Sequence, residues 1–195
     1  MSVNNTYYAL NSLNNNSGQD NTAIGAYAAY SSIDSSYNTC VGSNSLFYNT
    51  SGSDNTAVGA GAICNNTTGI LNTAVGSSAL EGVLTIPSGL PQSVGNQNVA
   101  VGVTTLFNNT GDFNTALGAY AGLAHTDGSG NSFLGAKTDV SDNTIIYTTS
   151  TALGYNAKIS ASNQIKMGGL NLAGDYPDVL IPGTAHFEKY TSGEY

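Results

Sequence analysis

The five residues at 55–59 read NTAVG, and the same five letters return at 72–76, seventeen positions further along the chain. Close variants of this phrase occur at 21–25 (NTAIG), 38–42 (NTCVG), 98–102 (NVAVG), 114–118 (NTALG), 131–135 (NSFLG) and 150–154 (STALG). The closing glycines are mostly 17 residues apart, and a final step of 14 residues leads from Gly154 to Gly168. A fixed period of this length is typical of solenoids, in which each repeat forms one coil. We therefore predict an all-β, parallel β-solenoid of about nine coils over residues 1–168.

Side chains alternate along each phrase, as expected for a strand. The side with the larger apolar residues is expected to form the hydrophobic core: Ile24, Val41, Val58, Val75, Val101, Leu117, Leu134 and Leu153. A column of threonines accompanies it and is also expected to lie inside: Thr22, Thr39, Thr56, Thr73, Thr115 and Thr151. The opposite side is expected to form a small-residue outer face suited to a subunit interface: Ala23, Ala57, Ala74, Ala100, Ala116 and Ala152, with Cys40 in the same column and only Phe133 large.

The rest of each repeat predicts a second strand and a polar turn. Segments such as 60–64 (AGAIC) and 103–107 (VTTLF) follow the glycine and are compatible with a returning strand, so two parallel sheets are expected. Turns rich in Gly, Asn, Asp and Ser then close each coil. The N-terminal stretch is a degenerate copy with Tyr8 at the position of the glycine. Residues 169–195 break the pattern and are expected to form a cap or a connector.

Composition narrows the range of partners. Only 8% of the residues are charged, the formal net charge is −8, and there are four Lys and no Arg. Nucleic acid is not an expected partner, because neutralising phosphates requires a basic face. No apolar run is long enough for a transmembrane helix, and the N-terminus lacks the pattern of a signal peptide, so membrane insertion is not expected. Neutral Asn, Ser and Thr can instead stack on copies of themselves in a ladder without like-charge repulsion.

The search for catalytic and metal-binding chemistry gives no candidate residues. His125, Asp127 and Ser129 contain the letters of a catalytic triad, but their spacing in a glycine-rich loop does not hold a base between its partners. Asp20 and Asp54 share a turn position two coils apart, a long separation for a pair of acids that would cleave a glycan. No cofactor, metal or enzymatic activity is therefore predicted, with a glycan-cleaving tailspike as a minor alternative.

The repeated NTAVG phrase and the closing ASNQIKMG at 161–168 resemble the YadA-like head repeats of trimeric autotransporter adhesins. Similar repeats occur in bacteriophage tail fibres and in fibre-like proteins of large viruses. The resemblance implies a left-handed β-roll, three chains packed side by side through their small-residue sheets, and a role in attachment. The 17-residue step is longer than the step of about 14 residues that is usual in that family. The chain also has no recognisable coiled-coil stalk or membrane anchor.

Two groups of residues are candidates for ligand binding. Tyr27 and Tyr120 share one repeat position, and Tyr30 shares another with Phe47 and Phe107, which would give either packing at the end of each coil or an exposed strip for a sugar or protein. The step from Gly76 to Gly102 is nine residues longer than usual. The extra residues fall within the stretch 82–97, which is expected to project from the side of the rod. They contain Pro87, Pro91 and the apolar candidates Leu84, Ile86 and Leu90.

Together these patterns predict a homotrimeric fibre head that binds a glycan or protein receptor on a host surface and assembles with other fibre or virion proteins. The expected location is the surface of a virus or phage-like particle, or alternatively a bacterial cell surface as an adhesin head. An ice-binding solenoid is a further alternative, for which regular threonine columns would be the basis.

Overall fold

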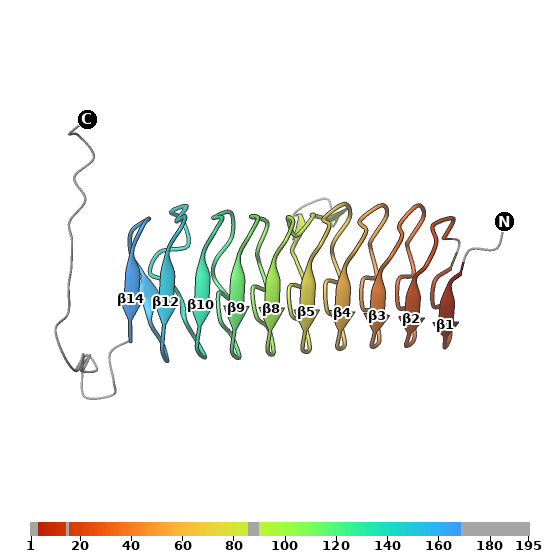
Figure 1. The fold of residues 1–195 in the computed structure, drawn as a ribbon, viewed down its shortest axis with the longest axis horizontal. Helices are drawn as coiled ribbons and strands as arrows, with labels where there is room; N and C mark the ends of the chain where they lie inside the picture. The colour runs from red at the N-terminus through yellow and green to blue at the C-terminus, as the bar shows by residue number, and fades with distance from the viewer. Residues whose placement is uncertain (1–3, 15, 86–89, 169–195) are drawn as a thin grey trace.

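The computed structural model describes residues 4–14, 16–85 and 90–168, and no side chains at 84–91. These residues form a parallel β-solenoid with no helix, in which one coil follows another along a straight rod (Figure 1). The predicted fold class, the repeat of about 17 residues and the number of about nine turns are therefore confirmed. The predicted cap or connector at 169–195 lies outside the described residues.

One long sheet runs the length of the rod. Its strands pair in parallel, and each NTAVG phrase aligns with the next, so that Thr56 pairs with Thr39 and Thr73. The ten strands, in spatial order, are β1 (Thr6–Tyr8), β2 (Thr22–Ile24), β3 (Thr39–Val41), β4 (Thr56–Val58), β5 (Thr73–Val75), β8 (Val99–Val101), β9 (Thr115–Leu117), β10 (Ser132–Leu134), β12 (Thr151–Leu153) and β14 (Ile165–Met167). In β1, Tyr8 pairs with Ile24, so Ala9 and not Tyr8 occupies the glycine position, with φ of 116°.

The predicted second sheet is largely absent from the described residues. The segments after the glycines are turns in which alternate residues have positive φ, as at Asn44 (57°) and Leu46 (53°), and such a backbone is not an extended strand. They still bond from coil to coil: the Leu46 amide donates to the Ala62 carbonyl at 2.9 Å. Only at the C-terminal end does a short parallel pair form, between β11 (Asp139–Val140) and β13 (Lys158–Ile159).

The prediction of which side of each strand faces the interior was wrong: the alanine side lies inside, and the threonine and valine side lies outside. The alanine column and Cys40 are fully buried, and the side chains on either side of them in each strand are half-buried or exposed. Leucine and isoleucine from the post-glycine segments fill the rest of the core: Leu46, Ile63, Leu80 and Leu106. The alanines therefore face these larger residues, and the coil is too narrow for valine on both walls.

One place in the rod supports this explanation, because there the strand wall carries the large residue and the facing wall carries the small one. Phe133 takes the place of alanine in β10 and is fully buried. On the facing wall Gly122 replaces the leucine, and a Cβ there would lie 3.2 Å from the Phe133 ring. A large strand residue therefore fits where the facing residue is small, as close packing of the interior requires.

A ladder of asparagines ties the coils together next to the sheet. In each, Oδ1 accepts from the backbone amide of the residue at the same position in the next coil, as Asn55 Oδ1 accepts from the Asn72 amide at 3.0 Å. Its Nδ2 donates to a turn carbonyl, as Asn55 Nδ2 donates to the Gly69 carbonyl at 2.9 Å. The buried members are Asn21, Asn38, Asn55, Asn72, Asn98, Asn114 and Asn131. The prediction of a neutral polar ladder is therefore confirmed, and it satisfies the buried amides without any charge.

Candidate functional site

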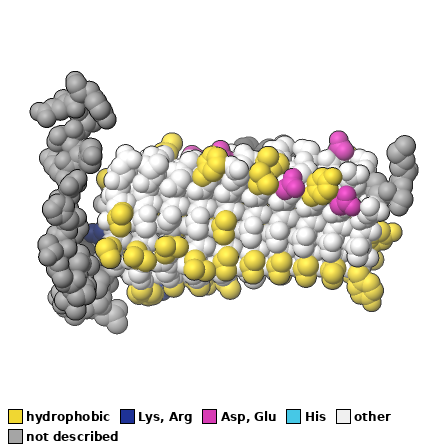
Figure 2. Space-filling view, viewed as in Figure 1, with side chains coloured by type: hydrophobic (Ala, Val, Ile, Leu, Met, Phe, Trp, Pro, Cys, Tyr) yellow, Lys and Arg dark blue, Asp and Glu magenta, His cyan; other side chains and the backbone are white. Residues whose placement is uncertain are grey.

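The outer face of the ten-stranded sheet is the first candidate surface. It carries the threonine column and the larger apolar column, both of which were expected inside, and several members are strongly exposed, such as Val75 (39%), Leu117 (53%) and Ile165 (72%). Figure 2 shows a row of hydrophobic side chains along the rod, and the visible Asp and Glu side chains lie on the opposite long edge. From β2 to β12 the outward columns are uncharged. The result is a flat, neutral face as long as the rod.

The predicted alanine interface cannot form, because these alanines do not lie on the surface of the chain. The six predicted interface residues are all 0% exposed and lie inside their own chain: Ala23, Ala57, Ala74, Ala100, Ala116 and Ala152. This correction follows from the narrow interior described above. Any contact between copies along this sheet would involve the opposite side chains of the same strands, such as Thr56 and Val58.

Aromatic side chains gather on the post-glycine side of coils two and three. Tyr30 stacks on Phe47 with ring centroids 5.2 Å apart and an interplanar angle of 19°, and Tyr48 meets Phe47 edge to face at 4.6 Å. Tyr27 contacts both Tyr30 (5.5 Å) and Phe47 (6.3 Å). All four rings are half-buried. The predicted residues Tyr27 and Tyr30 therefore lie together, and Tyr120 lies far from them, five coils further along the rod.

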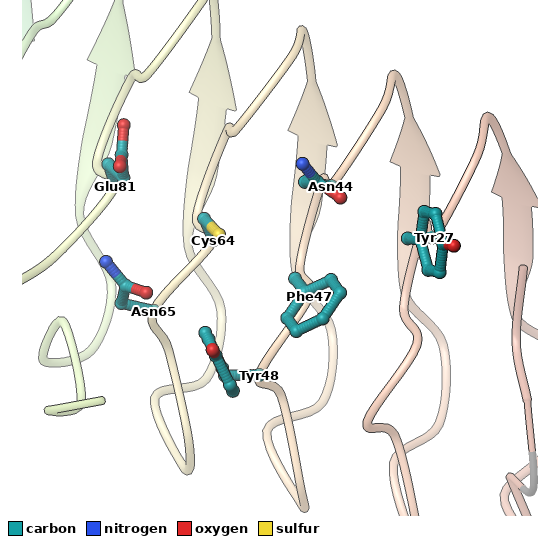
Figure 3. Close-up of a pocket in the computed structure, with 7 residues that line it drawn as sticks. All are labelled: Tyr27, Asn44, Phe47, Tyr48, Cys64, Asn65 and Glu81. Atoms are coloured by element: carbon teal, nitrogen blue, oxygen red, sulfur yellow. The ribbon is translucent and has the colours of Figure 1, made fainter. Parts of the chain in front are cut away.

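A hollow of about 480 Å³ opens beside this aromatic cluster. Tyr27, Phe47 and Tyr48 line one side of it, and Asn65 and Glu81 line the other, with Cys64 between them (Figure 3). Asn44 also lines the hollow. Gly61 explains why there is space here, because it occupies the repeat position of Tyr27, Asn44 and Tyr120 but has no side chain. A Cβ at Gly61 would meet no atom closer than 3.5 Å.

A second hollow of similar volume surrounds Tyr120 at the C-terminal part of the rod. Leu123, Asn156 and the lysines Lys137 and Lys158 line it together with Asp139. Lys158 pairs with Asp139 at 3.7 Å, and Lys137 lies over the Tyr155 ring at 5.8 Å from its centroid. The two hollows therefore differ in charge, since an unpaired carboxylate lines the first and two ammonium groups line the second.

The insertion leaves the coil as predicted. The chain departs after Gly82, forms an antiparallel pair between β6 (Leu84–Thr85) and β7 (Leu90–Pro91), and returns at Val94, which is buried. Strands β5 and β8 on either side of it still pair in register. The pair lies at the turn edge of the rod (Figure 1). Of the predicted binding residues, Ile86 is outside the described residues, and Leu84 and Leu90 are placed by their backbone only.

Buried ionisable groups have structural roles. His125 is 2% exposed, its Nε2 lies 2.9 Å from the Gly128 carbonyl, and burial lowers its pKa. Burial raises the pKa of Asp139, which accepts from the backbone amides of Ala124 and Val140. Burial also raises the pKa of the Cys40 thiol to about 12 and that of Cys64 to about 11, so both cysteines are protonated at neutral pH. They are free thiols.

His125, Asp127 and Ser129, the residue types of a catalytic triad, do not bond to one another in the structure. His125 points to the Gly128 carbonyl, and Asp127 accepts from the Thr110 hydroxyl at 2.6 Å. Within the described residues no cluster of three or more His, Cys, Asp or Glu side chains could hold a metal ion. The same part of the chain contains no helix of the length and hydrophobicity needed to cross a bilayer.

Comparisons with protein-family models, with curated proteins and with solved structures gave no match for this chain. The surfaces described above are therefore interpreted from their own geometry and chemistry. The sequence indicated the aromatic columns but not the hollow with Phe47, Tyr48 and Glu81. The signal that could have revealed it is Gly61, the glycine at a repeat position that otherwise carries a side chain.

Proposed function

We propose that this chain is a non-enzymatic attachment module that works as a homotrimeric fibre head on a virus or phage-like particle, or alternatively on a bacterial cell surface. The observation that supports it best is the flat, uncharged outer face of the ten-stranded sheet. A column of exposed apolar side chains of this length is unfavourable in water and is typical of a protein interface.

A second and a third copy of the chain are the partners that fit this face. Its columns repeat once per coil, at about 4.8 Å in a parallel sheet, and another copy carries columns with the same spacing. The net charge of −8 opposes self-association in general, so copies are expected to meet where their surfaces are uncharged. Closed cyclic symmetry then buries the face in every subunit.

The mass of the purified chain tests this assembly. Light scattering is expected to give three times 19.9 kDa. Val75→Lys places three ammonium groups near the common axis and is expected to give monomers with an unchanged β-type circular dichroism spectrum. Thr68→Lys, in an exposed turn, is the matched control and is expected to remain trimeric. A monomeric wild-type chain, or a Val75→Lys variant that stays trimeric, would contradict the proposed interface.

Attachment is tested separately, with the fluorescently labelled chain on a panel of bacterial and eukaryotic cells. The proposal expects saturable binding to some of these cells, with an avidity that the monomeric Val75→Lys variant loses. Absence of binding to all cells, or equal binding by the monomer, would count against a trimeric attachment module.

An ice-binding solenoid is the second candidate, because the threonine column lies on the outer face of the sheet and not inside it. Regularly spaced hydroxyl and methyl groups on a flat face are what such a function requires. This function needs the face to be exposed in a monomer, whereas the fibre head buries it. Thermal hysteresis from a monomeric chain, lost in Thr56→Lys, would favour ice binding over the trimer.

A further inference from the structure

The hollow beside the aromatic cluster has two chemically different sides. Phe47 and Tyr48 present aromatic surface on one side. Asn65 and Glu81 present oxygen atoms on the other, one and two coils further along the rod, or about 5 and 10 Å at the strand-stacking distance (Figure 3). Its volume of about 480 Å³ is in the range of small-ligand sites. The ligand that fits therefore has an apolar face and hydroxyl groups at its edge.

The polar side mostly accepts hydrogen bonds. Among the described residues, the Glu81 carboxylate has no hydrogen-bond partner. The Asn65 side-chain nitrogen donates to the Gly82 carbonyl at 3.0 Å, which leaves its side-chain oxygen available. The Cys64 thiol between the two sides is protonated, because burial raises its pKa. Asn44 is exposed and offers an amide that both donates and accepts. A ligand here must donate hydrogen bonds, and an anionic ligand would be repelled by Glu81.

We infer that this hollow binds a neutral oligosaccharide, with one pyranose face against Phe47 and Tyr48 and with sugar hydroxyls donating to Glu81 and Asn65. The inference deepens the proposed attachment function and rests on it, since it names the class of receptor. Aromatic rings offer a large, rigid apolar surface at low entropic cost, which suits the C–H face of a sugar. The hollow is open to solvent, so a chain of sugars can continue beyond it.

A cationic ligand such as a quaternary ammonium group is the main competitor for a site with aromatic rings and a carboxylate. The arrangement of the rings favours the sugar. Phe47 is stacked on Tyr30 and lies roughly perpendicular to Tyr48, so the rings form one continuous wall and do not enclose a cage. Salt separates the two ligands, because binding of a cation weakens with ionic strength and binding of a neutral sugar does not.

Titration calorimetry of the full chain with maltotriose, cellotriose and tri-N-acetylchitotriose tests the inference, with choline chloride as the cationic probe. We expect at least one trisaccharide to bind with an affinity that is unchanged between low and high salt. Cys64→Phe is expected to weaken it about tenfold or more, because it fills the hollow with the ring that Phe47 and Phe107 carry at the same repeat position. The solenoid tolerates this ring in other coils, so folding should be preserved.

Tyr27→Ala and Tyr120→Ala form the matched pair of controls. They remove the same ring at the same repeat position, but only Tyr27 lines this hollow. We expect Tyr27→Ala to weaken trisaccharide binding several-fold and Tyr120→Ala to leave it unchanged. No binding by any of the three trisaccharides, equal binding by Cys64→Phe, or salt-sensitive binding of choline alone would overturn the inference.

The mass of the same samples separates this inference from the proposed function. A trimer that attaches to cells but binds no trisaccharide would overturn the sugar site and leave the fibre head standing. A monomer that binds the trisaccharide through Tyr27 and Glu81 would support the site and overturn the trimeric assembly.

Discussion

The two halves of each coil follow different rules. The strand half repeats nearly the same five letters from coil to coil, whereas the post-glycine half changes, so that one repeat position holds Tyr27, Asn44, Gly61, Ser78 and Tyr120 in different coils. The strand half supplies the asparagine ladder, the alanine wall and the glycine corner, all of which must match the neighbouring coils. The post-glycine half points part of its side chains to solvent and is free to vary. The repeated half is therefore the scaffold, and the variable half is where a binding site can be built.

The glycine corner should be the least tolerant part of the scaffold. Gly59 has φ of +135°, and a Cβ there would lie 2.4 Å from the Gly76 carbonyl oxygen. We expect Gly59→Val to abolish folding or to lower the free energy of unfolding by more than about 3 kcal/mol. Gly61→Asn is the control in the variable half, since Asn44 occupies the same position with φ of 57°, and it should cost less than about 1 kcal/mol in urea unfolding. Similar losses for both variants would contradict the division into two halves.

The asparagine ladder should give the next largest effect. Asn55→Ala removes the acceptor of the Asn72 amide and the donor to the Gly69 carbonyl, and both groups are then buried without a partner. We expect a loss of about 2–4 kcal/mol in the free energy of unfolding. Ser43→Ala, at an exposed position without positive φ, should change it by less than about 0.5 kcal/mol. A small effect of Asn55→Ala would show that water replaces the ladder.

The two faces of the strand can be compared by adding volume to each. Ala57→Leu overpacks the interior against Leu46 and Ile63 and should cost about 1–3 kcal/mol of stability. Val58→Leu, on the outer face, should leave the unfolding of the monomer nearly unchanged. Chemical denaturation of both variants measures the difference, and a stable Ala57→Leu protein would show that the interior is less tightly packed than the structure indicates.

The smallest effect is expected from pH, through the buried histidine of the last coils. Burial lowers the pKa of His125 in the folded chain, so the unfolded chain binds the proton more readily and stability falls as pH drops below about 6.5. The slope cannot exceed about 1.4 kcal/mol per pH unit for one proton. His125→Gln should flatten the pH dependence between pH 7 and 5. Asp139 acts in the opposite direction, because its raised pKa favours the folded state as pH falls.

The sequence was sufficient to predict the fold because the same pattern of strand residues and closing glycine occurs in nearly every repeat. Every coil repeats the same phrase with the same glycine, and parallel in-register pairing is the one arrangement that stacks identical residues along a rod. The asparagine ladder follows from the same repetition. The ejected insertion could be predicted because its extra residues interrupt a fixed period, and the sheet on either side of it cannot slip by one residue without turning its side chains inside out.

The direction in which each strand faces was decided only by the tertiary structure. Alternation separates Thr and Val from Ala, but it does not say which set lies inside, because both sets contain residues that can be buried. The answer depends on the opposite wall: Leu46, Ile63, Leu80 and Leu106 project from turns whose positive φ angles the sequence did not reveal. They leave room for a small side chain such as alanine or cysteine, and they exclude valine. The repeat therefore determined the coil, and the space between its two walls determined which face meets the solvent.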